Sequence, residues 1–106
     1  MAKYVLLFTG GGMPETEAEK TAVMKAWADW YTALGTAVAD PGNPFGPAAK
    51  NLASNGTVSD GPVGVMATGY TILSADSLDQ AAELAKGCPH LRSGGTVTVY
   101  ETFDVM

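Results

Sequence analysis

The hydrophobic pattern near the N-terminus predicts a strand over residues 3–9. Because successive strand side chains point to opposite sides, Tyr4, Leu6 and Phe8 share one face. The other face, with Val5 and Leu7, is apolar too. A strand that is apolar on both faces is expected to be covered on both.

A helical period follows between residues 16 and 35. Thr16 and Glu19 have the spacing of a capping box, which satisfies free N–H groups at a helix start. Gly35 is expected to end this helix. Its apolar residues recur every three or four positions: Val23, Trp27, Trp30, Tyr31 and Leu34. The pattern predicts a helix that packs on one face.

The second half of the chain repeats the strand-then-helix order. Residues 65–74 predict a strand, and Ser77 with Gln80 forms a second capping-box pattern. Gly87 is expected to end the helix in the left-handed conformation, and Pro89 to prevent the helix from resuming. The apolar face of this helix comprises Leu78, Ala81, Ala82 and Ala85.

Shorter elements complete the pattern. A short strand is expected over 36–39, and the three prolines of 40–47 exclude regular structure there. Asn55-Gly56 predicts a hairpin turn between 51–54 and 57–59. A final strand is expected over 96–103, where polar and apolar residues alternate.

The resulting order is β-α-β-β-α-β, a ferredoxin-like α+β fold with a four-stranded antiparallel sheet. Two helices cover one face of such a sheet. The other face then leaves apolar side chains such as Val5 and Leu7 exposed, which predicts a partner. Pairing of two sheet faces in a symmetric homodimer is the simplest solution.

Composition limits the classes of function. The 106 residues predict a single domain, and 46% hydrophobic against 16% charged residues is typical of a folded chain. The net charge of −5 argues against nucleic acid as a partner. No apolar run predicts a membrane helix, and no signal-peptide pattern is present. Cys88 is the only cysteine, so the expected location is the reducing cytoplasm.

Several short motifs, taken in order, resemble the YCII-related proteins and in particular their DGPF branch. Asp60-Gly61-Pro62 matches three letters of the branch name, with Val63 in place of the Phe. The other motifs are Gly69-Tyr70, the Ser77-capped alanine-rich helix, Gly87-Cys88-Pro89 and residues 94–101 (GGTVTVYE). The resemblance implies a dimeric α/β barrel. Most such proteins are small bacterial proteins of unknown function; some accompany sigma factors, and a few act on aromatic breakdown products.

The resemblance also bears on catalysis. YCII proteins carry a histidine in the first helix and an aspartate after the second, proposed to form a His–Asp pair. Trp27 and Cys88 stand at those two positions. An indole has only a donor N–H and exchanges no proton at neutral pH, so the proposed pair is not expected here, and whether the protein is an enzyme stays open.

His90, the only histidine, is the candidate general base. Asp40 or Asp60 would be its carboxylate partner. The alternative is a surface or capping histidine on a loop. Cys88, at a helix C-terminus, is expected to be a small buried side chain rather than a nucleophile.

Tyr70 and Tyr100 are the main candidates to line a ligand pocket, because a phenol can pack and still offer a hydroxyl. Trp27, Trp30 and Tyr31 are expected to pack in the core, although Trp30 or Tyr31 could border the cleft. Asp60 is a further candidate for ligand binding. One histidine and one cysteine without zinc-type spacing predict no metal site, and nothing implies a cofactor. Gly10-Gly-Gly12 is expected to be a flexible turn rather than a phosphate loop.

Two hypotheses of function follow. In the first, a small aromatic or lactone-like molecule is either bound or also transformed in a cleft between the sheet and the Pro/Gly-rich loop. It predicts a concave pocket with convergent polar groups. In the second, a dimeric accessory or regulatory module contacts another protein, which predicts a filled barrel and an exposed apolar patch elsewhere.

Overall fold

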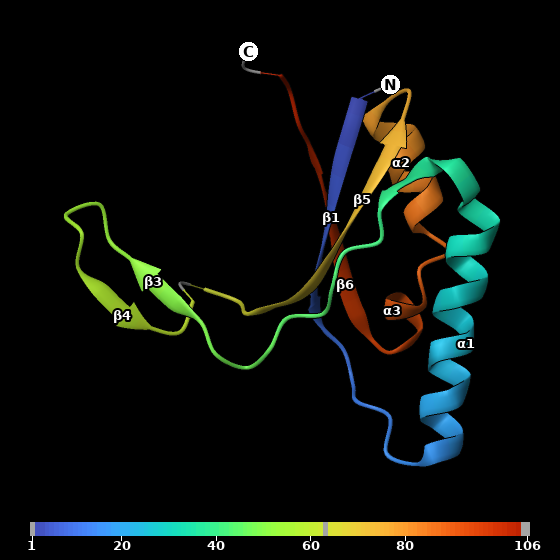
Figure 1. Cartoon of the computed structure of the whole chain (residues 1–106), viewed down its shortest axis with the longest axis horizontal. Helices are drawn as coiled ribbons and strands as arrows, with labels where there is room; N and C mark the ends of the chain where they lie inside the picture. Colours follow the sequence, from blue (N-terminus) through green and yellow to red (C-terminus); the bar gives the residue numbers. More distant parts are fainter. Residues whose placement is uncertain (1, 63, 105–106) are drawn as a thin grey trace.

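The computed structural model describes residues 2–62 and 64–104 (Figure 1). Its elements follow the predicted order, with a short 3-10 turn (η1) and a third helix added. They are β1 (Ala2–Gly10), α1 (Glu17–Leu34), η1 (Gly35–Ala37), β2 (Val38–Asp40), β3 (Lys50–Leu52), β4 (Val58–Asp60), β5 (Ala67–Ala75), α2 (Leu78–Ala85), α3 (Pro89–Arg92) and β6 (Gly95–Glu101).

Four strands form an antiparallel sheet in the order β2-β5-β1-β6. The two longest strands, β1 and β5, are its centre. The three helices lie together on one side of this sheet (Figure 1). The prediction of an α+β fold with a four-stranded antiparallel sheet is confirmed, and the strand order is compatible with a ferredoxin-like fold.

The predicted helix starts are confirmed in atomic detail. The Thr16 hydroxyl accepts a hydrogen bond from the Glu19 amide (3.1 Å), and the Ser77 hydroxyl accepts one from the Gln80 amide (3.0 Å). Gly35 ends α1 with a φ of 57°, a conformation that favours glycine. Local sequence therefore determines where both long helices begin.

The predicted end of α2 is wrong in one respect. Gly87 does not adopt a positive φ, and Lys86 caps the helix in an ordinary helical conformation. Pro89 then occupies the first turn of α3. Proline is well tolerated there because the first amides of a helix have no partner within it. Pro89 thus begins α3, and it also prevents α2 from continuing.

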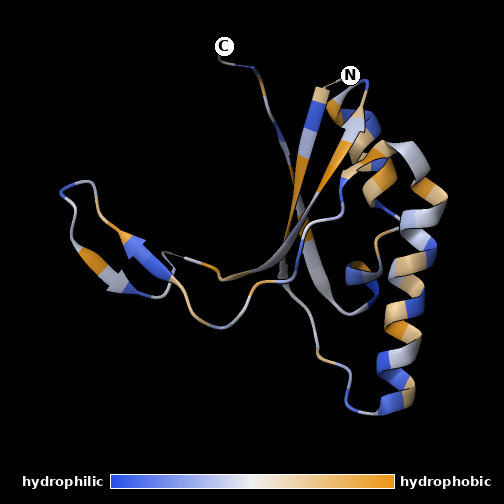
Figure 2. Cartoon of the chain, viewed as in Figure 1, coloured by the Kyte–Doolittle hydropathy of each residue, from blue (hydrophilic) through white to orange (hydrophobic). Residues whose placement is uncertain are grey.

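The core lies between the sheet and the helices. Along β1 and β5, buried side chains alternate with half-buried or exposed ones. The buried side chains share the strand face that points toward the helices. The main cluster comprises Leu6, Phe8, Trp30, Leu73, Ala85 and Cys88. In Figure 2 the central strands are correspondingly apolar.

The opposite side, called the open face from here on, has no helix over it (Figure 1). Val5 lies opposite Ile72 and Tyr100, its cross-strand neighbours. Leu7 lies opposite Tyr70 in the same way. These side chains are half-buried or exposed within the single chain. The expectation of an apolar sheet face without cover is therefore met.

Strands β3 and β4 form a separate hairpin, called the arm (residues 50–60). The Asn55-Gly56 turn predicted for it is present, with Gly56 at a φ of 89°. The arm projects away from the sheet on the side opposite the helices (Figure 1). This projection explains a Cα radius of gyration of 15.3 Å, where a compact domain of this length has about 13 Å.

Candidate functional site

A groove of about 480 Å³ opens between α1, β5 and the loop of residues 41–44. This volume is within the range of small-molecule sites. Its lining comes from one face of α1, the loop, and the ends of two central strands: Met24, Trp27, Ala28, Tyr31, Pro41, Gly42, Asn43, Pro44, Thr68, Gly69, Tyr70 and Phe8. The groove is on the helix side of the sheet.

The loop forms the outer wall because it continues the line of β2 along β5. The Tyr70 amide donates to the Asn43 carbonyl (3.3 Å), and the Phe45 amide donates to the Thr68 carbonyl (2.8 Å). The Asp40 carboxylate accepts from the Gly42 amide (2.8 Å) at the start of the loop. Three prolines and these bonds keep a segment without regular structure in a fixed position.

Two glycines permit this close approach. Gly42 has a φ of +71°, and a Cβ there would lie 1.9 Å from the Tyr70 carbonyl oxygen. A Cβ on Gly69 would lie 3.2 Å from both the Asn43 carbonyl oxygen and the Pro44 Cα. Only a backbone without side chains brings the loop this close to β5.

Two hydroxyl groups attach the loop to the helix and the sheet. The Tyr31 hydroxyl lies 3.0 Å from the Pro41 carbonyl oxygen and 2.9 Å from Thr71 Oγ1. Thr71 Oγ1 lies 3.0 Å from the same carbonyl. Two hydroxyl hydrogens serve these three contacts, so two of the three are hydrogen bonds at any moment. Burial, as the largest effect, raises the pKa of Tyr31, which keeps the phenol protonated at neutral pH.

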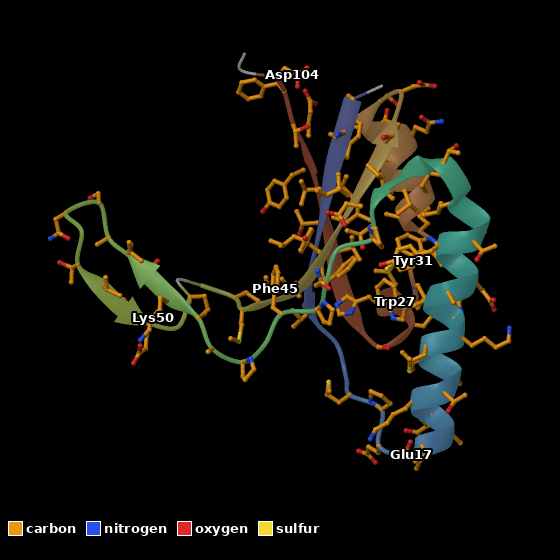
Figure 3. The ribbon with its side chains drawn as sticks, in the orientation of Figure 1. Glu17, Trp27, Tyr31, Phe45, Lys50 and Asp104 are labelled. Atoms are coloured by element: carbon orange, nitrogen blue, oxygen red, sulfur yellow. The ribbon has the colours of Figure 1, made fainter. Side chains whose placement is uncertain are left out.

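Aromatic rings form most of the apolar wall. The Trp27 ring lies edge-on to Phe8, with centroids 5.4 Å apart, and 5.8 Å from the Tyr31 ring. Both Trp27 and Tyr31 are directed from α1 toward the sheet (Figure 3). Among the described residues that line the groove, none is charged. The site therefore offers ring faces and hydroxyl or backbone groups.

The structure does not bring His90 and Asp40 together by a hydrogen bond or an ion pair in the described part of the chain. His90 Nε2–H donates to the Thr9 carbonyl (2.8 Å), and the ring packs on Phe8 at 5.3 Å. A Cβ on Gly95 would lie only 2.1 Å from His90 Nε2. The ring is thus half-buried and hydrogen-bonded to the backbone, and His90 lies in the helix α3 rather than on the loop that was predicted.

The four other predicted site residues are spread over the molecule. Trp30 is in the core, where its indole N–H donates to the Leu84 carbonyl (3.2 Å). Tyr70 lines the groove and stacks on Phe45 (5.8 Å). Tyr100 is exposed on the open face, and Asp60 is exposed in the arm. Of these four, the groove includes Tyr70.

Trp27 was expected to pack in the core, with Trp30 or Tyr31 at the border of a cleft, whereas the groove is lined by Trp27 and Tyr31. The signal was available in its spacing, because Trp27 precedes Tyr31 by one helical turn and so shares its face. Cys88 is buried as expected, and burial raises its pKa to about 11, which keeps the thiol protonated. The resemblance placed Trp27 and Cys88 at the positions of an acid–base pair, and neither exchanges a proton at neutral pH.

Among the described residues, no group of three or more His, Cys, Asp or Glu side chains lies close enough together to hold a metal ion. None of the helices described has the length and apolar character needed to span a membrane.

Comparison with protein-family models and with curated proteins gives no match to this chain. The resemblance to YCII-related proteins therefore stays a prediction from the sequence motifs.

Proposed function

We propose that the protein binds a small, uncharged aromatic molecule in the groove, as a homodimer paired through the open face. The observation that carries the binding proposal is the lining itself, which combines four aromatic residues (Phe8, Trp27, Tyr31 and Tyr70) with no charged side chain among the described residues. Planar rings pack favourably against such walls.

Electrostatics narrows the ligand class. A carboxylate that enters the groove loses its hydration and meets no cationic side chain there, which is unfavourable. The chain also has a net charge of −5, which repels anions at longer range. Neutral rings that carry an oxygen, such as aromatic lactones, fit better than aromatic acids.

The groove supports binding more directly than catalysis. Its described lining contains no His, Cys, Asp, Glu or Lys, so it lacks the side chains that usually transfer protons near neutrality. The Tyr31 phenol stays protonated, because its pKa is raised. Its hydroxyl can donate to a ligand oxygen when Thr71 Oγ1 alone donates to the Pro41 carbonyl, so ligand binding would replace one internal hydrogen bond of Tyr31.

The two indole N–H groups allow a direct test. With 15N-labelled tryptophan, coumarin (a neutral aromatic lactone) should shift the Trp27 indole signal and leave that of Trp30, which is bonded to Leu84 within the core. Benzoate should bind at least about tenfold more weakly. The Trp27→Leu variant, which no longer carries this signal, should bind coumarin at least about tenfold more weakly when binding is measured by titration calorimetry.

Two results would contradict this proposal. One is a wild-type protein whose Trp27 signal responds to neither coumarin nor acetophenone. The other is equal affinity for coumarin and benzoate, which would require a cationic contact that the described lining does not contain.

A second candidate function is the accessory module that contacts another protein. The observation in its favour is exposed apolar surface outside the groove, on Leu52, Val58 and Val65. Sedimentation of the purified chain separates the two candidates. A monomer that leaves these three residues exposed favours a partner other than this chain. A homodimer that covers them makes a different partner protein unnecessary.

A further inference from the structure

We infer that the arm is exchanged between two copies of this chain, so that the arm of each copy packs across the open face of the other. The inference rests on the homodimer proposed above and specifies what the arm contributes to it. Four independent features of the described structure support it.

The first feature is the isolation of the arm. The contacts of β3 and β4 are mainly with each other. An isolated two-stranded hairpin is at best marginally stable in water. The arm therefore needs a surface to pack on, and the body of its own chain does not supply one.

The second feature is the amphipathic pattern of the arm. Leu52 lies opposite Val58, and Lys50 lies opposite Asp60 on the same face of the hairpin. Leu52 is 66% exposed and Val58 57% exposed. Figure 2 shows apolar residues in both strands. The exposed Leu52–Val58 pair is at the turn end of this face, and covering it would remove apolar surface from water.

The third feature is the amount of surface. The chain exposes 7279 Å², whereas a folded monomer of 10.9 kDa exposes about 5,600 Å². The excess of about 1,700 Å² per chain would give an interface of about 3,400 Å² in total, which is within the range of obligate homodimers. An arm and a sheet face buried together account for an area of this size.

The fourth feature is charge. The chain is acidic overall, with a net charge of −5, so two copies repel each other unless the surfaces that meet are neutral. The described open-face positions of β1, β5 and β6 carry no acidic residue, and Lys3 is their one charge; on the edge strand β2, the acidic Asp40 pairs with Ile72. In the arm, Lys50 and Asp60 form an ion pair and cancel. Arm and open face are thus the surfaces that two copies can bring together.

Geometry indicates the direction of exchange. The arm extends on the side of the sheet opposite the helices, which is the side of the open face (Figure 1). An apolar groove of about 420 Å³ lies at the base of the arm, lined in part by Phe45 and Met66. The stacking of Phe45 on Tyr70 joins this groove to the open face. In a two-fold dimer each copy both gives and receives the same contact.

A spin label at the tip of the arm tests the exchange. Ser54→Cys provides a reactive exposed thiol, since Cys88 is buried with a pKa raised to about 11 and does not react. The labelled copy is mixed and refolded with 15N-labelled wild-type chain. We expect amide signals of the open-face strands of the wild-type copy to broaden. A label at Thr21→Cys, on the exposed side of α1, is the matched control and should leave those signals sharp.

A pair of substitutions tests the contribution of the arm to affinity. Leu52→Asp and Asn55→Asp each add one negative charge to the arm. The second keeps an acceptor oxygen for the Thr57 amide. Leu52→Asp should weaken the dimer at least about tenfold, and Asn55→Asp less than about twofold, by sedimentation equilibrium. The Trp30 indole signal reports that the core remains folded.

The outcomes separate the proposals. A wild-type chain that is monomeric overturns both the dimer and the exchange. A dimer whose open-face signals stay sharp with the Ser54→Cys label overturns the exchange and leaves the pairing of sheet faces. Coumarin binding at Trp27 is measured on the same samples, so a failure of the ligand-binding proposal is distinguished from a failure of the dimer or of the arm exchange.

Discussion

The two faces of the sheet are made from the same strands and carry similar apolar residues, yet they have different environments. Leu6 and Leu7 are neighbours in β1; Leu6 is fully buried beneath the helices, and Leu7 lies half-buried on the open face. The difference arises from cover and not from residue type. On the helix side the chain completes its own core, whereas the open face leaves apolar side chains for a second molecule.

The proposed functions follow the same division. The groove is on the covered side, at a place where the cover is incomplete and Trp27 and Tyr31 face the loop. The arm and the open face are on the other side. Apart from Tyr70, which lines the groove and also lies on the open face, ligand binding and self-association are expected to depend on different residues, and substitutions there can separate them.

The largest expected effect contrasts the two leucines. Leu6→Ala should lower the free energy of unfolding by about 2–5 kcal/mol, because it leaves a cavity in the core. Leu7→Ala should cost the single chain about 1 kcal/mol, since its side chain is only partly removed from water, and should mainly weaken the dimer. Urea unfolding and sedimentation at several protein concentrations measure the two effects. An equal loss of stability for both variants in a monomeric chain would contradict the contrast.

The next effect concerns the wall of the groove. Gly42→Ala forces a positive φ on alanine and a contact with the Tyr70 carbonyl, so it should destabilise the fold by about 2 kcal/mol. It should also weaken coumarin binding at least about tenfold, because the loop moves away from β5. The dimer should weaken less than coumarin binding does, since Gly42 reaches the open face through Tyr70, which lies opposite Leu7.

Gly46→Ala is the matched control within the same segment. Gly46 has no positive φ, and a Cβ there meets no atom within 4 Å. Its effect on stability should stay within about 0.5 kcal/mol. If both variants bind coumarin like the wild type, the position of the loop does not determine the groove.

The sequence predicted the features that depend on local chemistry. The caps at Thr16 and Ser77 and the Asn55-Gly56 turn each rest on hydrogen bonds or backbone preferences within a few residues. The end of α2 was predicted only in part, because a proline can stop one helix and also start the next, as Pro89 does. Gly87 was expected to be left-handed, but the Lys86 amide bonds to carbonyls of the last helical turn, so no such residue is needed.

The site was harder to predict because it depends on contacts between distant segments. Helical spacing showed that Trp27, Trp30 and Tyr31 pack together, but not which ring faces the loop. That outcome follows from the rotation of α1, which places Trp30 against Leu84. The close approach of the loop to β5 requires Gly42 and Gly69 at positions far apart in the sequence. No local pattern reveals such a pair.

The smallest expected effect concerns the two hydroxyl groups that attach the loop. Tyr31→Phe and Thr71→Val each remove one hydroxyl, and in either variant the other hydroxyl still lies 3.0 Å from the Pro41 carbonyl and can donate to it. Each should therefore lower the free energy of unfolding by only about 0.5–1.5 kcal/mol.

The double variant reveals whether the two hydroxyls act as substitutes for each other. Without either donor, the Pro41 carbonyl oxygen loses both partners, so the double variant should cost about 1 kcal/mol more than the sum of the single variants. Urea unfolding of the four proteins completes this double-mutant cycle. An additive result would mean that water reaches the carbonyl from the groove and replaces the lost donors, in which case the hydroxyl pair does not fix the loop, and the wall of the groove depends on the glycine contacts alone.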